Sequence, residues 1–265
     1  NNKVIYIDHH PMEEGNINTD DYLLSIFDKE SQSCSLLIWE KLIPETNNPY
    51  YIFLTLLGYF GDGGDKDEIP LELQMKAQKL LKLQTKFGVH DLMERKQSSF
   101  GGEYLEIEKY VSALNTGKRM HWNGDIPFEL MKNIDNFKPF IYNHHPLAQQ
   151  LQEYRRELRN YYNMDIEVNE TNKLQYSVID CDKNVQGVLC ARHMKDKPII
   201  VLNRRNDEII ASMRVPDNVD FDAGMFLNGL TGKVPTLVGG GHEKAGGVTF
   251  KEEHLDLFLD LLRES

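Results

Sequence analysis

A short apolar run at residues 4–7, VIYI, is followed at once by the polar triplet Asp8-His9-His10. Its apolar residues do not alternate with polar ones, which suits a strand buried on both faces of a parallel sheet. The run therefore favours an α/β fold with a parallel sheet. Because open α/β sheets build their sites at the carboxyl ends of their strands, the triplet lies where a site is expected.

Helical patterns follow this strand. One predicted helix is nearly all apolar, and the glycine-rich segment Gly61-Asp62-Gly63-Gly64 ends it. A later segment carries apolar residues at steps of 4, 3, 4 and 3 between Leu147 and Tyr161, which places them on one stripe of a helix. The nearly all-apolar helix is predicted at 51–60. Further helices are predicted at 33–42, 71–87 and 102–114, with a polar turn at 115–119.

From about residue 164 the pattern changes to short strands separated by turns. Strands are predicted at 174–179, 198–202, 208–215 and 248–250, with helices at 186–194 and from residue 252. A length of 265 residues suits two domains, at roughly 150 residues for each. We expect a first domain at 1–143, a connector helix at 144–163 and a second, smaller α/β domain at 164–265.

The composition restricts the partners and the location of the protein. Lys and Arg number 30 and Asp and Glu number 41, so the net charge of −11 provides no sequence-wide basic surface for nucleic acid. A polyanionic substrate must then be held locally, by metal ions or by a few cationic side chains. The three cysteines are far apart, which argues against a disulfide framework and favours a cytoplasmic setting. No apolar stretch is long enough to span a membrane, so no membrane contact is expected.

The triplet at 8–10 offers a carboxylate and two imidazoles, which are natural ligands for a divalent transition metal. The alternative is a capping aspartate beside two partly exposed histidines. A second histidine pair, His144-His145, also precedes a proline. It follows neither a carboxylate nor an apolar strand, and we interpret it as the turn that enters a helix.

Two glycine-rich segments are candidates for close approach of a ligand. Asp62 stands between Gly61 and Gly63, where the backbone can bend tightly beside a metal ion or phosphate; the alternative is an ordinary helix-ending loop. The run from Gly239 to Gly241, followed by His242, is predicted to be a loop whose consecutive N–H groups cradle a phosphate or carboxylate. Arg214 on a preceding strand could add a bidentate cation, or could be a surface arginine at a strand edge.

The order of these motifs resembles the DHH phosphoesterase superfamily with its DHHA1 partner domain. The resemblance rests on Asp8-His9-His10, Gly61-Asp62, Ser212-x-Arg214 and the glycine-rich stretch from Gly239 to Gly247. It extends over nearly the whole chain. The segment from Asn115 to Arg119 further resembles the N-A-x-G-R motif of RecJ-like nucleases.

The resemblance implies a hydrolase with two Mn2+ ions, with Mg2+ as the other candidate, and roles for individual residues. His9 and Asp62 would be metal ligands, Asp8 would support the site, and His10 would face the scissile phosphate. The substrate would be held by Arg214, Gly239, Gly240, Gly241 and His242, and its strand would pass Asn115 and Arg119. Two further motifs normally precede D-H-H in this superfamily, and the sequence has nothing there. We therefore expect a fragment rather than a degenerate member, and expect this chain alone to be inactive if those ligands are missing.

The leading hypothesis is a manganese-dependent exonuclease of RecJ type that trims single-stranded DNA or RNA. One alternative is a phosphodiesterase or phosphatase for nano-oligonucleotides, cyclic dinucleotides or a phosphoadenosine nucleotide. Another is an inactive scaffold associated with replication, although a scaffold has no chemical use for Asp8, His9, His10 and Asp62. Replication or repair proteins are the partners that such a protein would have. Digestion polarity, substrate length and oligomeric state are left open by the sequence.

Overall fold

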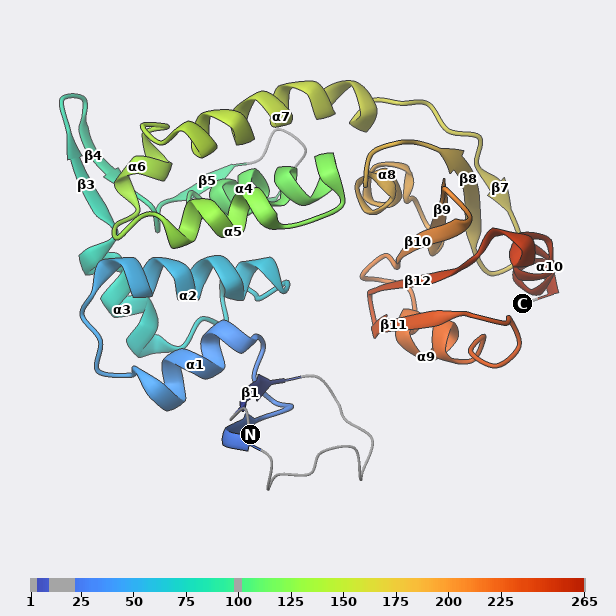
Figure 1. Ribbon diagram of the computed structural model, residues 1–265, viewed down its shortest axis with the longest axis horizontal. Coiled ribbons are helices and arrows are strands. Elements are labelled where there is room, and N and C mark those ends of the chain that lie inside the picture. The colour runs from blue at the N-terminus through green and yellow to red at the C-terminus, as the bar shows by residue number, and fades with distance from the viewer. Residues whose placement is uncertain (1–3, 10–21, 98–101, 265) are drawn as a thin grey trace. The chain divides into compact units, whose positions relative to one another are not determined.

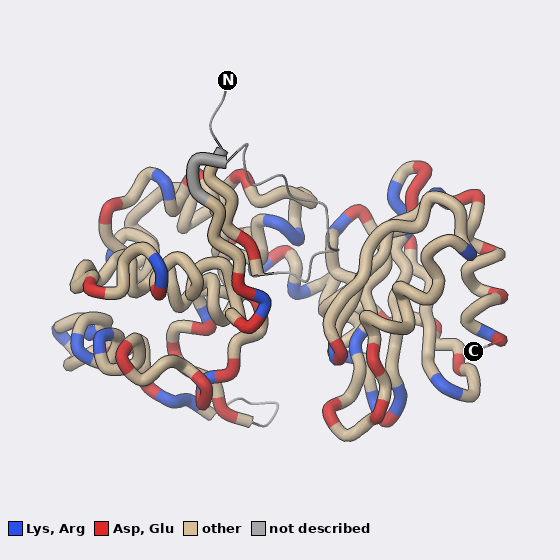
Figure 2. Tube along the Cα trace, turned by 90° about the horizontal axis from the view of Figure 1, so that it is seen from below, with Lys and Arg blue, Asp and Glu red and all other residues tan. Residues whose placement is uncertain are grey.

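The computed structural model describes residues 4–9, 22–97 and 102–264, and Figure 1 shows the elements that they form. The chain divides into two compact units, both of mixed α/β structure. Unit 1 comprises Asn1–Thr116 and Asp125–Gln152, and unit 2 comprises Gly117–Gly124 and Glu153–Ser265. The predicted connector at 144–163 contains the helix α7 (Pro146–Tyr162). Acidic and basic residues are interspersed along both units (Figure 2). Within the described ranges, no helix is both long and apolar enough to cross a membrane.

The strand at the start of unit 1 forms as predicted, but its burial differs from the prediction. β1 (Val4–Asp8) pairs in parallel with β2 (Tyr22–Phe27), and Asp8 lies opposite Phe27. Ile5 is 59% exposed, so the expectation of burial on both faces is wrong for the described part of this sheet. The prediction of a parallel strand from the apolar run is correct. Apolar residues that do not alternate with polar ones suit parallel strands whether or not both faces are fully covered.

The helices α1 (Cys34–Leu42) and α2 (Pro49–Gly61) form the predicted pair beside this sheet. The hydroxyl of Ser33 caps α1 by accepting the Leu36 N–H at 3.1 Å, and α2 ends at the predicted glycine-rich segment. Most of α2 is buried, which explains its apolar sequence. Its buried residues are Tyr50, Ile52, Phe53, Thr55, Leu56, Leu57 and Tyr59. The ring of Phe53 lies 5.2 Å from that of Phe137, so the later helices close over the same core.

The next segments correct two helix predictions. The helix predicted at 71–87 ends early, as α3 (Leu71–Leu80), and the chain continues into a hairpin of β3 (Lys82–Thr85) and β4 (Gly88–Asp91). Gly88 has φ +115°, a value that side chains with a Cβ rarely adopt, which suits the tight turn that enters β4. A second hairpin, β5 (Arg95–Gln97) with β6 (Glu103–Leu105), occupies the start of the segment predicted as helix at 102–114.

The helix α4 (Glu108–His121) replaces the polar turn predicted at 115–119. Thr116 is 1% exposed, and its hydroxyl donates to the carbonyls of Ala113 at 2.5 Å and Leu151 at 3.2 Å. Thr116 is therefore compatible with a helix, because its hydroxyl is satisfied by a carbonyl of its own helix and by a carbonyl of α7. Unit 1 is completed by α5 (Asp125–Lys132), α6 (Lys138–Ile141) and the first part of α7.

Unit 2 contains a six-stranded sheet with the order β11-β12-β10-β9-β8-β7. β8 and β9 are parallel and are joined by α8, whereas the other neighbours are antiparallel. The tight turn at Asn206 and Asp207 joins β9 to β10 as predicted, with Asn206 at φ +57°. The strands are β7 (Asn169–Glu170), β8 (Gln175–Asp180), β9 (Ile199–Arg205), β10 (Glu208–Arg214), β11 (Val238–His242) and β12 (Ala245–Lys251).

Helices cover both faces of this sheet. On one face, α8 (Gln186–His193) packs against β9 and β10, and the apolar residues there include Leu189, Ile199 and Val201. On the other face lie α9 (Ala223–Asn228) and the terminal helix α10 (Leu255–Glu264). The rings of Phe250 and Phe258 stack at 4.7 Å and tie α10 to β12. The alternation of buried residues along β10 follows from this two-sided packing.

Candidate functional site

The site in unit 1 is centred on His9, which follows β1 directly and is 8% exposed. The His9 Nδ1 atom lies 3.0 Å from the carbonyl oxygen of Ser31, which can only accept a hydrogen bond. This partner assigns the proton of a neutral His9 to Nδ1 and leaves the lone pair on Nε2. The Nε2 atom lies 3.5 Å from Oδ2 of Asp62. An imidazole fixed by a backbone carbonyl, with its other nitrogen beside a carboxylate, is the arrangement of a metal-ligating histidine.

Asp62 reaches this position as the residue that ends α2. Its backbone N–H donates to the carbonyl of Gly58 at 3.0 Å, which fixes the start of the loop. Its side chain is 49% exposed, so the carboxylate can be reached from solvent. The fold therefore brings His9 and Asp62 together although they are far apart in the sequence, and their role as metal ligands stays a prediction.

Asp8 fixes the chain at the end of β1. Its Oδ2 accepts the hydroxyl of Tyr6 at 2.8 Å, and its Oδ1 accepts the N–H of His9 at 2.7 Å. Cys34 lies next to these carboxylates. Burial, followed by the negative charges of Asp8 and Asp62, raises the pKa of the Cys34 thiol. The thiol therefore stays protonated at neutral pH, and the local potential favours a cation over a thiolate.

The donor set fits part of a divalent metal site. An imidazole nitrogen and a carboxylate oxygen suit Mn2+, which takes about six ligands in octahedral geometry. Within the described ranges, no group of three or more His, Cys, Asp or Glu side chains is placed to hold a metal ion. His10 lies outside the described residues. His9 and Asp62 would supply two of the ligands that such an ion needs, and their role stays a prediction.

The candidate residues of unit 2 lie on neighbouring strands. Arg214 of β10 pairs with Ala245 of β12, and Ala245 pairs with His242 of β11. Ser212 lies two residues before Arg214 on β10, so its side chain points to the same face, and it pairs with Gly247. Residues directly opposite one another in antiparallel strands share a face, so Arg214 and Ser212 lie on the face that carries α8.

Arg214 is half-buried and is held from two sides. Its Nη1 donates to the carbonyl of Met213 at 2.7 Å. A Cβ placed on Gly187, in the first turn of α8, would lie 3.5 Å from Arg214 Nη2 and 3.5 Å from Ser212 Oγ. The guanidinium therefore lies against the beginning of α8, above small residues on β12. The combination of a cation, a hydroxyl and a helix start suits an anionic group.

Residues 238–242 form β11, an edge strand paired with β12, where a loop is predicted. Successive N–H groups of a strand point in opposite directions, so a phosphate contact here would use alternate residues, and that contact stays a prediction. Gly239 has φ +140°, and a Cβ there would lie 2.2 Å from the carbonyl oxygen of Gly247. A Cβ on Gly241 would lie 2.3 Å from the carbonyl oxygen of Ala245. These two glycines permit the close approach of β11 to β12, a role that their sequence does not separate from ligand binding.

The remaining predicted residues occupy other parts of the two units. Asn115 lies in unit 1, whereas Arg119 lies in unit 2, where its Nη1 donates to the Tyr162 hydroxyl at 3.3 Å. Their role beside a substrate strand stays a prediction. His145 accepts the N–H of Leu147 through Nδ1 at 3.2 Å, which confirms that the second histidine pair enters a helix.

Sequence reasoning missed three groups that position the site: Tyr6, the Ser31 carbonyl and Gly187. Tyr6 carries a usable signal, because it precedes Asp8 by two residues and so shares its side of β1. The Ser31 carbonyl and Gly187 carry none, since backbone groups become partners only through the fold.

Comparison with known proteins identifies the second unit. Residues 172–265 match the family model of the DHHA1 domain. No curated protein matches the sequence. The DHH domain of a member of the s1p family of ribosomal proteins has a similar fold, with a TM-score of 0.59 and 17% identity over 98% of this chain. This chain spans 64% of the length of that structure.

Two other solved structures have lower TM-scores. A pGpG-specific phosphodiesterase from Vibrio cholerae gives 0.42, with 12% identity over 92% of this chain and 79% of its own. The C-Ala domain of alanyl-tRNA synthetase from Aquifex aeolicus gives 0.32, with 21% identity over 38% of this chain and 96% of its own. Neither score establishes a shared fold over the whole chain.

Proposed function

We propose that this chain, which belongs to the DHH/DHHA1 superfamily of phosphoesterases, hydrolyses phosphodiester bonds in single-stranded nucleic acid with the help of Mn2+. The activity would be that of a RecJ-type exonuclease, which removes nucleotides from the end of a strand. The observation that carries the proposal is the pair of His9 and Asp62. The Ser31 carbonyl fixes the His9 ring, and Nε2 lies 3.5 Å from the Asp62 carboxylate.

The two units would contribute different parts of the chemistry. Divalent ions, held in part by His9 and Asp62, would lower the pKa of the attacking water and neutralise charge at the phosphate. Asp8 would keep His9 in place through its hydrogen bond to the His9 N–H. Arg214 would hold a phosphate of the substrate by a charge-assisted hydrogen bond, with Ser212 beside it. His242 would be a further donor, since it stands in the same row of the sheet as Arg214.

A second candidate is favoured by the charge of the chain. A net charge of −11 disfavours long polyanions that bind through many phosphates, and dinucleotides or cyclic dinucleotides present fewer of them. The second candidate is therefore a phosphodiesterase for such short substrates, with the same roles for His9, Asp62 and Arg214.

Hydrolysis by the metal-depleted protein, with and without added Mn2+ or Mg2+, tests both candidates. The substrates would be end-labelled single-stranded DNA and RNA, a linear dinucleotide and a cyclic dinucleotide. Mn2+-dependent release of mononucleotides from the labelled strands would support the exonuclease, and cleavage of the dinucleotides alone would favour the second candidate. Absence of metal-dependent hydrolysis on every substrate, by a protein that also carries the motifs expected before Asp8, would contradict both and would favour a scaffold. Inactivity of this chain alone is the result expected if those ligands are missing.

Arg214→Ala should raise KM about thirtyfold and change kcat little. A charge-assisted hydrogen bond to phosphate contributes about 2 kcal/mol, and contacts made equally in the ground and transition states appear in KM. Steady-state kinetics on the preferred substrate measure both constants. Arg204→Ala is the matched control, because Arg204 of β9 is paired with Glu252 at 3.1 Å and should not affect KM. A large loss of kcat at unchanged KM would instead make Arg214 a transition-state group.

A further inference from the structure

The β3–β4 hairpin of unit 1 carries an exposed aromatic side chain at its tip. Phe87 is 89% exposed and Val89 is 59% exposed, and neither belongs to the proposed metal site of His9 and Asp62. The ammonium group of Lys86 lies 4.9 Å from the centroid of the Phe87 ring. Figure 1 shows the hairpin projecting from the helices of unit 1. Phe87 and Val89 are both exposed apolar side chains that line one hollow beside the hairpin, which makes this face a candidate contact surface.

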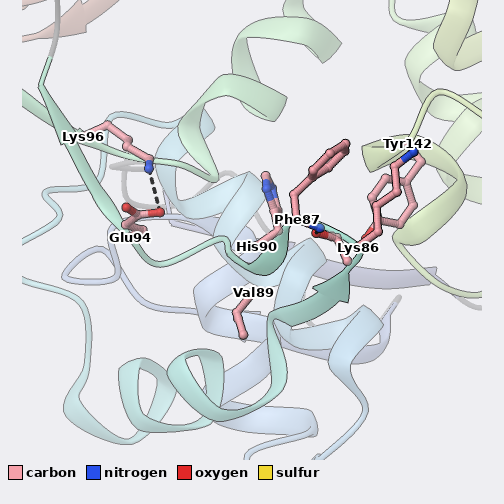
Figure 3. A pocket seen from close by; sticks show the side chains of 8 residues that line it. Lys86, Phe87, Val89, His90, Glu94, Lys96 and Tyr142 are labelled. Carbon is pink, nitrogen blue, oxygen red and sulfur yellow. Dashed lines mark hydrogen bonds and ion pairs between the residues drawn. The ribbon is translucent and has the colours of Figure 1, made fainter.

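A pocket of about 580 Å³ lies along this hairpin, a volume within the range of roughly 300–1,000 Å³ that is typical of ligand pockets. Figure 3 shows the side chains around it, with the ion pair of Lys96 and Glu94 on one side. The lining residues are Thr85, Lys86, Phe87, Val89, His90, Glu94, Lys96 and Tyr142.

Among the residues that line the pocket, basic side chains outnumber acidic ones, whereas the whole chain has more acidic than basic residues. The lining includes two lysines and one carboxylate, whereas the chain has a net charge of −11. Glu94 is already paired with Lys96, with Nζ and Oε2 2.6 Å apart. Lys86 forms no ion pair with any residue that the structure describes, so its ammonium group remains available to an anion.

We propose that this pocket binds an unpaired nucleobase of a single-stranded nucleic acid, with the base stacked on Phe87 and an adjacent phosphate beside Lys86. The inference rests on the proposed function, since it adds a second contact for the same class of substrate. Aromatic rings that accept a base face, combined with ammonium groups for the backbone, characterise single-strand binding sites. Duplex nucleic acid would not fit, because its bases are already stacked on one another.

Binding of a fluorescein-labelled deoxythymidine 12-mer, measured by anisotropy in EDTA, tests this inference without hydrolysis. Phe87→Ala should weaken binding about tenfold, and Phe87→Trp should retain it, because alanine removes the stacking surface and tryptophan keeps it. Phe128→Ala is the matched control and should bind as the unmodified protein does. Phe128 is also an exposed phenylalanine, at 64%, with the Lys132 ammonium 5.8 Å from its ring centroid, but it lies outside the pocket lining.

An abasic strand of equal length separates base stacking from phosphate contact. Phe87→Ala should bind the abasic strand as the unmodified protein does, whereas Lys86→Ala should weaken binding of both strands and lower the salt dependence. Unchanged binding of the thymidine strand by Phe87→Ala would overturn the inference and leave the hairpin as a contact for a protein. An equal loss on the abasic strand, or no binding by the unmodified protein, would also overturn it.

The binding result and the proposed function are judged separately. Metal-dependent hydrolysis of a dinucleotide by the unmodified protein reports the proposed function alone. Loss of thymidine-strand binding in Phe87→Ala, in a protein that hydrolyses nothing, would support the pocket and contradict the proposed function. If the unmodified protein hydrolyses the dinucleotide and Phe87→Ala binds the thymidine strand normally, the proposed function is supported and the pocket is contradicted.

Discussion

His9→Ala should lower kcat for metal-dependent hydrolysis by on the order of a thousandfold while the protein remains folded. The His9 ring is buried, and its Nδ1 is occupied by the Ser31 carbonyl, so Nε2 is the atom left to face a cation beside Asp62. Alanine removes the proposed ligand and leaves the Ser31 carbonyl without its imidazole partner. The measurement is kcat over a range of Mn2+ concentrations, with circular dichroism to check the fold. Excess Mn2+ should not restore the rate fully, because the geometry of the remaining ligands is also lost.

Two further variants make this expectation specific. Asp62→Asn should cause a comparable loss, since it removes the charge at a half-exposed position where the fold loses little. His144→Ala is the control, because His144 is exposed and belongs to the turn that enters α7. Near-normal turnover of His9→Ala, or a similar loss in His144→Ala, would contradict the assignment of the metal ligands.

The sequence predicts the elements whose burial has a regular period. The stripe from Leu147 to Tyr161 gives α7, and the alternation between residues 208 and 214 gives β10. It fails where tertiary contacts outweigh local preference. Thr116 is satisfied by the carbonyls of Ala113 and Leu151, which turns a predicted turn into the middle of α4. The segment predicted as helix at 71–87 leaves the helix after Leu80 and forms a hairpin, in which Gly88 adopts φ +115° at the start of β4.

The candidate site is predictable to the extent that its side chains form motifs. The order of the motifs predicts a shared site for His9 and Asp62, and the structure places their side chains 3.5 Å apart. The Ser31 carbonyl that orients His9 is a backbone group, and no residue type signals it. The glycine run is ambiguous for a different reason. A glycine indicates that another group approaches the backbone closely. In β11 one such group is the carbonyl of Gly247 on the paired strand β12.

Gly239→Ala should destabilise unit 2 by about 3 kcal/mol or more and weaken the substrate binding proposed for it. The new Cβ would lie 2.2 Å from the Gly247 carbonyl oxygen, and the residue would have to keep φ +140°. Neither problem is relieved by a side-chain movement, because the neighbouring atoms are backbone. β11 would separate from β12, and His242 would lose its place in the row with Arg214. Urea unfolding measures the stability, and a lower midpoint at an unchanged slope is the expected result.

Gly240→Ala is the matched control, because it places the same methyl group one residue along the same strand. Its Cβ would meet the side-chain amide oxygen of Asn228 at 3.1 Å, and a side chain can move, so the expected loss is below about 1 kcal/mol. Gly241→Ala should resemble Gly239→Ala, since its Cβ would lie 2.3 Å from the Ala245 carbonyl oxygen. A phosphate cradle predicts a different pattern, in which all three variants raise KM without a change in stability. If Gly240→Ala proves as damaging to binding as its neighbours while all three remain equally stable, the glycines serve the ligand rather than the pairing of β11 with β12.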